Sequence, residues 1–172
     1  LRCLVGSEMC IRDRDITEQL LSVMAKYDNI SNYVHLPLQA GSNKILKRMN
    51  RTYSKEYFIK LAFKIKEILP NVGISTDIIV GFPGESENDF NETLDVMNEI
   101  KFDSAFNFKY SPRRGTKASE YDDQIPGDIM QERLQRVINL QKIHTLENNE
   151  KLVGNFENCL LYTSPSPRDI GE

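Results

Sequence analysis

One run of eight residues, Gly73 to Val80, constrains the fold of this chain more than any other feature. Its sequence is apolar and β-branched along most of its length, as expected for a strand that is covered on both faces. Segments with helical periodicity precede and follow it, so strands and helices alternate along the chain. Such alternation predicts right-handed βαβ units with parallel strands.

The alternation extends over most of the chain. Strands are expected over about 33–38, 73–80 and 104–110, and helices over about 16–27, 43–49, 55–69, 87–100 and 128–150. Asp15 with Glu18 forms a capping-box pattern, while Ser54 caps a helix that Pro70 ends. The prediction is an α/β fold whose working groups gather at the carboxyl ends of three parallel strands.

Composition excludes several classes of protein. The 172 residues are one domain's worth, and a net charge of -3 argues against a globally basic nucleic-acid binder, although a local basic face remains open. No apolar run approaches the roughly 20 residues of a membrane helix, and the amino end lacks the apolar core of a secretory signal.

The two ends do not resemble the middle. Residues 1–14 and 159–172 show neither helical nor strand periodicity and resemble read-through of sequencing adapters, so we expect both to be non-native; flexible native tails are the alternative. The three cysteines, Cys3, Cys10 and Cys159, lie in these ends. Their spacing matches no zinc or iron–sulfur motif, so no metal ligand is predicted in this chain.

Candidate binding groups follow each expected strand. A strand-end carboxylate at Asp77 suits the vicinal hydroxyls of a ribose, or else bonds a neighbouring backbone. Arg51 suits a substrate carboxylate, or else joins Lys44, Lys47 and Arg48 on a solvated basic face. The turns after the first two strands add Gln39, Ser42, Gly81 and Gly84.

The loop after the third strand combines an aromatic ring, two guanidinium groups and hydroxyls. This loop, residues 110–116 with Arg113 and Thr116, suits base stacking and phosphate binding, or is an ordinary exposed loop. His35 lacks a carboxylate or cysteine partner in the sequence pattern and is interpreted as structural, and His144 as a surface residue. The acidic residues 120–123 are interpreted as a solvated turn.

Taken in order, four segments are more specific than any one alone. The segments YVHLPLQAGS, ILKRMNR, STDIIVGFPGE and YSPRRGT resemble the radical S-adenosylmethionine (SAM) methylthiotransferases, most of all those that make 2-methylthio-N(6)-dimethylallyladenosine in tRNA. The resemblance covers nearly all of residues 15–158. Arg114 departs from it, because the family usually has proline there.

The resemblance implies a fold and a site. The three strands would be the last three of an open six-stranded (βα) barrel, in a partial radical SAM domain over 15–151. Arg51 would hold the methionine carboxylate of SAM and Asp77 the ribose hydroxyls, with Gln39 beside them and residues 81–85 passing the adenine. Arg113 and Thr116 would border the tRNA entrance. Residues 152–158 would begin a truncated RNA-binding domain.

The resemblance also implies what this sequence lacks. The family binds [4Fe-4S] clusters through cysteines, including a CxxxCxxC motif, that are missing here, so the chain is expected to be an inactive fragment carrying part of the SAM pocket. The intact enzyme would be a cytoplasmic monomer that uses SAM, iron–sulfur clusters and an electron donor to transfer a methylthio group to tRNA, without a membrane partner.

Two alternatives remain open. A family member with another substrate would modify a ribosomal-protein aspartate or the threonylcarbamoyl-modified adenosine of other tRNAs. A protein of a different class would be a non-catalytic α/β module that binds a nucleoside, and it would not depend on Arg51 or Asp77.

Overall fold

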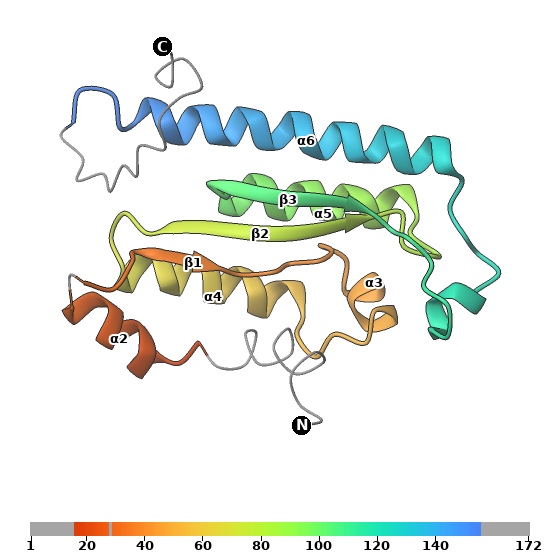
Figure 1. Cartoon of the computed structure of the whole chain (residues 1–172), viewed down its shortest axis with the longest axis horizontal. Helices are drawn as coiled ribbons and strands as arrows, with labels where there is room; N and C mark the ends of the chain where they lie inside the picture. Colours follow the sequence, from red (N-terminus) through yellow and green to blue (C-terminus); the bar gives the residue numbers. More distant parts are fainter. Residues whose placement is uncertain (1–15, 28, 156–172) are drawn as a thin grey trace, which may run out of the picture.

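A three-stranded parallel sheet organises the protein. The computed structural model describes residues 16–27 and 29–155. The strands β1 (Tyr33–His35), β2 (Gly73–Val80) and β3 (Ser104–Lys109) lie in the order β1-β2-β3, with β2 in the middle (Figure 1). The α/β fold with parallel strands predicted from the alternating pattern is therefore confirmed.

Helices connect and cover the strands. The long α6 runs alongside β3, at the opposite side of the sheet from α2 (Figure 1). Among residues 16–27 and 29–155, the helices are α2 (Glu18–Lys26), α3 (Asn43–Arg48), α4 (Lys55–Ile68), α5 (Glu87–Ile100), the 3-10 helix η1 (Lys117–Glu120) and α6 (Gly127–Glu150).

The core lies between the sheet and α4 and α5. Every second residue of β2 from Ile74 to Val80 is fully buried, and all of these except Thr76 join one apolar cluster with side chains of both helices. This burial of alternate positions follows from the two-residue period of a strand. The main participants are Ile74, Ile78 and Val80 from β2, Phe58 and Ile65 from α4, and Phe90, Met97 and Ile100 from α5.

The opposite face of the sheet corrects the expectation that the central strand is covered on both faces. Asp77 and Ile79 are only half-buried, and their neighbours in register, Phe106 and Phe108, are 55% and 52% exposed. No described element packs on this open face. Because large exposed apolar side chains on one contiguous surface mark an interaction site, this face is suited to contact another part of a larger protein or a ligand.

The helix boundaries follow local capping signals, with one correction. Ser54 caps α4 by accepting a hydrogen bond from the Tyr57 amide, as predicted. The N-cap of α2 is Thr17, whose hydroxyl accepts from the Leu20 amide, and not Asp15, which lies outside the described residues. Helix α2 presents Leu21 to the core, with 1% of that residue exposed, and leaves the neighbouring Leu20 45% exposed.

Helix α6 packs through polar residues more than expected. Of its apolar residues only Val137 is fully buried, while the polar residues Arg133, Gln141 and His144 are buried in the same helix. The surface assignment of His144 is wrong: its Nε2 lies 3.1 Å from Asn98 Oδ1, and burial lowers the pKa of the imidazole. Helix α6 packs against α5, and polar side chains buried in this contact, such as His144, need hydrogen-bond partners.

Several predictions concern segments outside the described residues. These are the two ends expected to be non-native, the three cysteines and residues 156–158 of the expected RNA-binding domain, so the domain boundaries stay predictions. No helix in the described part of the chain is long and apolar enough to cross a membrane.

Candidate cofactor site at the strand ends

A hollow of about 540 Å³ opens at the carboxyl ends of all three strands. The size lies within the range of ligand pockets in proteins. The hollow contains side chains from the turn after β1, from the ends of β2 and β3, and from the loop after β3. We call it the strand-end hollow; its lining includes Gln39, Arg51, Asp77, Ile79, Phe108, Tyr110, Arg113 and Thr116.

Gln39 is held in an unusual backbone conformation at this hollow. Its amide donates to Asp77 O at 2.7 Å and its carbonyl accepts from the Ile79 amide at 2.9 Å, which prolongs the pairing of β1 with β2. Its φ of 68° is uncommon for a residue with a side chain. The side-chain oxygen is buried without a hydrogen-bond partner among the described residues, so the site has an unused acceptor.

A helix C-terminus positions Arg51. Asn50 takes a left-handed conformation with φ 58°, its amide donates to Lys47 O, and the Arg51 amide donates to Leu46 O at 2.9 Å. This is a Schellman motif, which ends α3 and turns the chain back. Arg51 thereby reaches the strand-end hollow, with its Nε buried and lacking a partner in the described chain.

Asp77 reaches the hollow from the open face of β2. Its carboxylate is 22% exposed, and Oδ2 lies 3.3 Å from Nε2 of His35. The sequence pattern had assigned His35 no carboxylate partner, which is wrong, because parallel pairing of β1 with β2 brings the two side chains onto one face.

The loop after β3 closes the hollow with its own hydrogen bonds. Thr116 donates from both its amide and its hydroxyl to Arg113 O, at 3.1 and 2.8 Å. Gly115, with φ 82°, makes this tight turn possible. The two hydrogen bonds give the loop a defined shape without proline at position 114. The Arg113 side chain is exposed at the rim of the hollow.

Three other predicted binding residues are occupied by packing. The Ser42 hydroxyl donates to Asp89 Oδ1 at 2.6 Å in a buried contact. Gly81 and Gly84 take left-handed conformations with φ 74° and 77°, which favour glycine, and a Cβ would lie 2.2 Å from the Met130 side chain or 2.5 Å from Asp123. None of the three lines the described hollows, and cofactor contact for them stays a prediction.

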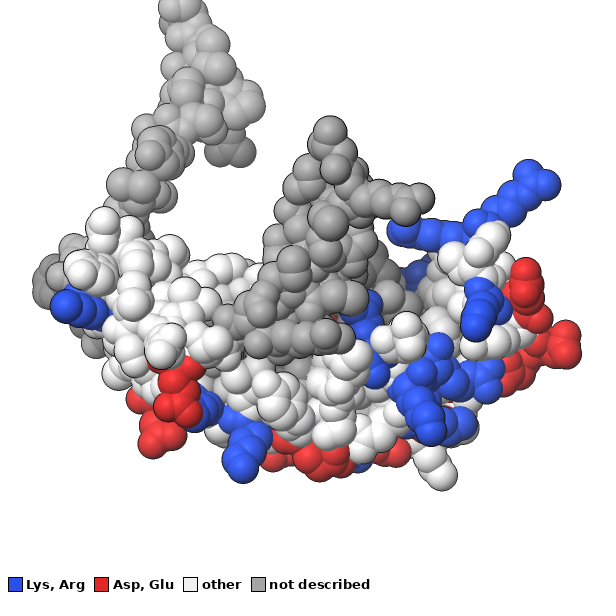
Figure 2. All heavy atoms as spheres, turned by 90° about the horizontal axis from the view of Figure 1, so that it is seen from below, with Lys and Arg blue, Asp and Glu red and all other residues white. Residues whose placement is uncertain are grey.

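A second hollow of about 1010 Å³ adjoins the first. The two share Gln39, Arg51, Ile79, Tyr110, Thr116 and Ala118, so they form one continuous depression. Lys44, Lys47, Arg48 and Lys117 add positive charge to the second hollow. Figure 2 shows basic side chains gathered toward this end of the molecule, which gives a local basic surface on a chain of net charge -3.

Ion pairs fix part of this basic surface, which corrects its interpretation as simply solvated. Arg48 lies 2.7 Å from Asp123 and stacks 4.6 Å from the Tyr121 ring centroid. Lys44 lies 2.7 Å from Asp89. Burial raises the pKa of Asp89, but hydrogen bonds from Lys44, Ser42 and Ser86 outweigh it and hold the pKa well below its usual range. The ion pair of Arg48 with Asp123 holds the acidic turn, residues 120–123, against α3.

A buried ion pair that the sequence analysis missed holds the turn after β2. Arg133 Nη1 of α6 donates to Glu85 Oε2 at 2.8 Å and to Glu85 O at 3.0 Å. Glu85 also accepts from the Gly81 amide at 2.8 Å. Burial raises the pKa of Glu85, while Gly81 and Arg133 lower it. The pair locks the turn beside the hollow to α6.

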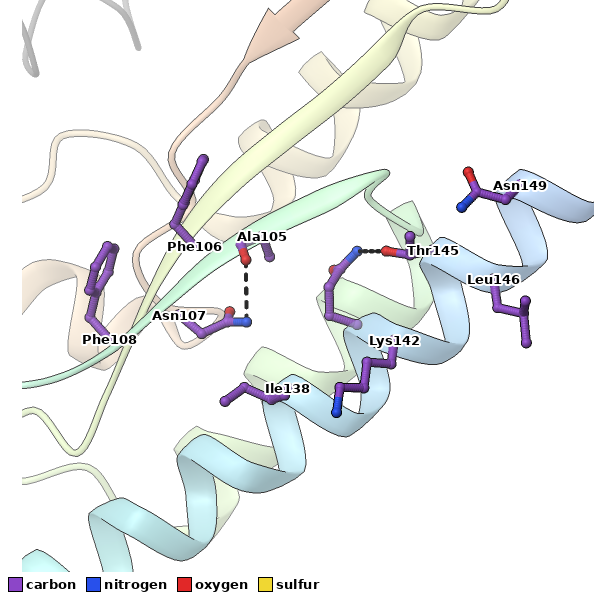
Figure 3. Close-up of a pocket in the computed structure, with 10 residues that line it drawn as sticks. Ala105, Phe106, Asn107, Phe108, Ile138, Lys142, Thr145, Leu146 and Asn149 are labelled. Atoms are coloured by element: carbon purple, nitrogen blue, oxygen red, sulfur yellow. Dashed lines mark hydrogen bonds between the residues drawn. The ribbon is translucent and has the colours of Figure 1, made fainter. Parts of the chain in front are cut away.

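A separate groove of about 610 Å³ runs between β3 and α6. Asn107 points across it toward α6, whereas Phe106 and Phe108 point to the other side of β3 (Figure 3). Gln141 on the α6 wall donates to Phe102 O at 2.8 Å and to Thr145 Oγ1 at 3.0 Å. The first of these hydrogen bonds joins α6 to the residues just before β3, and the second lies within α6. Fewer charged side chains line this groove than line the strand-end hollow.

The geometry defines a class of protein: an α/β protein with a parallel sheet whose strand ends surround a polar hollow. The sequence profile described as the radical SAM superfamily matches residues 5–97, just over half of the chain. The chain belongs to that superfamily.

Curated relatives resemble a large part of this chain. Proteins described as "tRNA-2-methylthio-N(6)-dimethylallyladenosine synthase" are 47% identical over 148 residues in Carboxydothermus hydrogenoformans and 46% identical over 143 residues in Clostridium tetani. A Clostridium botulinum relative of the same description is 42% identical over 153 residues. These alignments cover 83–89% of this chain but only 32–34% of each relative. The chain therefore spans about a third of their length.

Proposed function

We propose that this chain is part of a radical SAM tRNA methylthiotransferase and carries one side of its SAM pocket. The whole enzyme transfers a methylthio group to carbon 2 of N(6)-dimethylallyladenosine beside the tRNA anticodon. The observation that supports the site most strongly is the meeting of Gln39, Arg51 and Asp77 in one hollow. The shared description of the three relatives supports the substrate, and a tRNA substrate implies a cytoplasmic reaction.

The residues in the hollow match the groups of SAM. The Arg51 guanidinium binds the methionine carboxylate, and the Asp77 carboxylate accepts hydrogen bonds from the ribose hydroxyls. The unpartnered Gln39 amide oxygen and Arg51 Nε provide hydrogen-bonding capacity that a polar ligand satisfies after small side-chain rotations. When bound, SAM supplies the methyl group and the radical chemistry; these residues hold and orient it.

The iron–sulfur cluster of the family does not fit the residues present. Its ligands are cysteines, and the three cysteines here, at positions 3, 10 and 159, lack the CxxxCxxC spacing. The described residues also contain no group of three His, Cys, Asp or Glu side chains placed to hold a metal ion. We therefore assign no ligand of the cluster and no electron-transfer step to this chain.

The basic hollow beside the cofactor hollow supports a tRNA substrate. Lys47, Lys117 and Arg113 surround a depression with aromatic walls at Tyr110 and Tyr121. Cationic side chains attract phosphates and aromatic rings stack on bases, which suits an unstacked anticodon-loop nucleotide.

A binding experiment tests the cofactor site. S-adenosylhomocysteine is titrated calorimetrically into the full-length protein that contains this chain, and into its Arg51→Ala and Asp77→Ala variants. Each variant is expected to bind at least tenfold more weakly, because it loses a charged hydrogen-bonding group. Arg114→Ala and Asp122→Ala are the matched controls, since neither lines the described hollows. Equal affinity in all five proteins would reject the site.

The substrate has its own test. Nucleosides from the tRNA of a strain lacking the gene are separated and identified by mass spectrometry. The proposal requires loss of the 2-methylthio group from dimethylallyladenosine and its return with the gene. If the methylthio group is lost instead from threonylcarbamoyladenosine or from a ribosomal protein, the proposed substrate is wrong and the enzyme acts on another substrate of the family.

A further inference from the structure

A hydrogen-bonded chain of three side chains crosses the open face of the sheet behind the strand-end hollow. His35 Nδ1 lies 2.8 Å from Ser75 Oγ, and His35 Nε2 lies 3.3 Å from Asp77 Oδ2. The parallel register places His35 beside Ser75 and Asp77 two residues further along β2. The imidazole also contacts the Phe106 ring edge-on, with centroids 6.1 Å apart.

The chemistry of these groups fixes their roles. A carboxylate can only accept hydrogen bonds, so Nε2 of His35 carries the hydrogen that faces Asp77. In the neutral imidazole Nδ1 is then an acceptor, and the buried Ser75 hydroxyl donates to it. Ser75 thereby selects the tautomer that points a donor at Asp77.

This arrangement leaves one oxygen of Asp77 for a ligand. His35 engages Oδ2, and within the described part of the chain Oδ1 has no hydrogen-bond partner. Asp77 lines the hollow whereas His35 does not, so the imidazole stands behind the carboxylate. A carboxylate held from behind loses less rotational freedom when it binds a ligand, which favours binding.

We propose that His35, oriented by Ser75, is a positioning residue that holds the Asp77 carboxylate toward the ribose hydroxyls of the bound nucleoside. The proposal rests on the SAM site proposed above and deepens it. His35 does not touch the ligand, so its effect must vanish when either Asp77 or the ribose diol is removed.

The test uses calorimetric titration of the full-length protein with S-adenosylhomocysteine and with its 2′,3′-dideoxy analogue. His35→Phe keeps a ring against Phe106 but lacks the donor, and is expected to bind S-adenosylhomocysteine about tenfold more weakly. His35→Gln restores a donor and is expected to recover most of this loss. For the dideoxy analogue, His35→Phe is expected to change the affinity less than twofold.

The double variant separates the two proposals. In the Asp77→Ala background, His35→Phe is expected to have no further effect on S-adenosylhomocysteine binding. If Asp77→Ala weakens binding but His35→Phe does not, the positioning role is wrong and the SAM site stands. If Asp77→Ala has no effect, the SAM site itself fails. Equal losses for the diol and dideoxy ligands would show that His35→Phe acts through the fold alone. Thermal unfolding of each variant checks that the protein remains folded.

Discussion

Replacing Arg133 by alanine is expected to destabilise the protein by about 3–5 kcal/mol, the usual cost of leaving one partner of a buried ion pair alone. The side chains of Arg133 and Glu85 are only 6% and 1% exposed, so water cannot replace the lost guanidinium. Arg133 also donates to the Glu85 carbonyl, which loses this partner as well. The loss is large against the 5–15 kcal/mol by which typical domains are stable.

A matched control lies one turn further along α6. Arg136 pairs with Glu87, but the two side chains are 37% and 52% exposed. Solvent weakens such a pair, so Arg136→Ala is expected to cost about 1 kcal/mol or less. Urea unfolding followed by circular dichroism measures both variants of this chain. A loss below about 1 kcal/mol for Arg133→Ala, or equal losses for the two variants, would refute the reasoning.

The pH dependence of the Arg133 variant provides a second check. Burial already raises the pKa of Glu85, and removing the guanidinium raises it further. A carboxyl group with a folded pKa above its unfolded value costs stability as the pH rises from the unfolded pKa through the folded one. The deficit of Arg133→Ala is therefore expected to shrink on acidification toward about pH 4.

Three further predictions concern other parts of the chain. Gly41→Ala places a Cβ 2.4 Å from the Thr93 backbone and is expected to cost about 2 kcal/mol or more in urea unfolding, whereas Gly127→Ala, with no neighbour within 4 Å, is expected to be nearly neutral. Asp89, whose folded pKa is lowered, stabilises the fold above its unfolded pKa, so stability falls below about pH 4, and Asp89→Asn is expected to flatten that part of the profile. The isolated chain is expected to produce no methylthiolated tRNA in a nucleoside assay, and detectable product would contradict the proposed need for the rest of the enzyme.

The sequence was sufficient to predict most of the helices and strands and the meeting of several candidate binding residues, although β1 ends at His35 and η1 was not predicted. Strand β2 and helix α5 have the predicted bounds, because their periodicity and their caps are local signals. The meeting of Gln39, Asp77 and Arg113 at one hollow follows from parallel strands, whose carboxyl ends share an edge of the sheet.

Contacts between distant residues could not be predicted in the same way. Glu85 and Arg133 are 48 residues apart, and His35 and Asp77 are 42 apart, so no spacing rule relates them. The pairing of Arg48 with Asp123 likewise depends on how the loop after β3 returns to α3. Only a general signal existed for Glu85 and Asp77, because a carboxylate in or directly after a buried strand needs a partner, and this signal does not identify the partner.

The open face of the sheet was also missed. An apolar strand in a parallel sheet indicates cover on both faces, yet Phe106 and Phe108 are exposed in the described structure. Composition cannot distinguish side chains buried by the same chain from those buried by another part of a larger protein. The exposed aromatic residues agree with a chain that spans about a third of its relatives.

A crystal structure of the full-length protein with S-adenosylhomocysteine tests the central claim most directly. The ligand carboxylate is expected to lie within hydrogen-bonding distance of Arg51, and its ribose hydroxyls are expected to contact Asp77 Oδ1. A ligand bound elsewhere, with Arg51 and Asp77 both free of contact to it, would contradict the proposed SAM site.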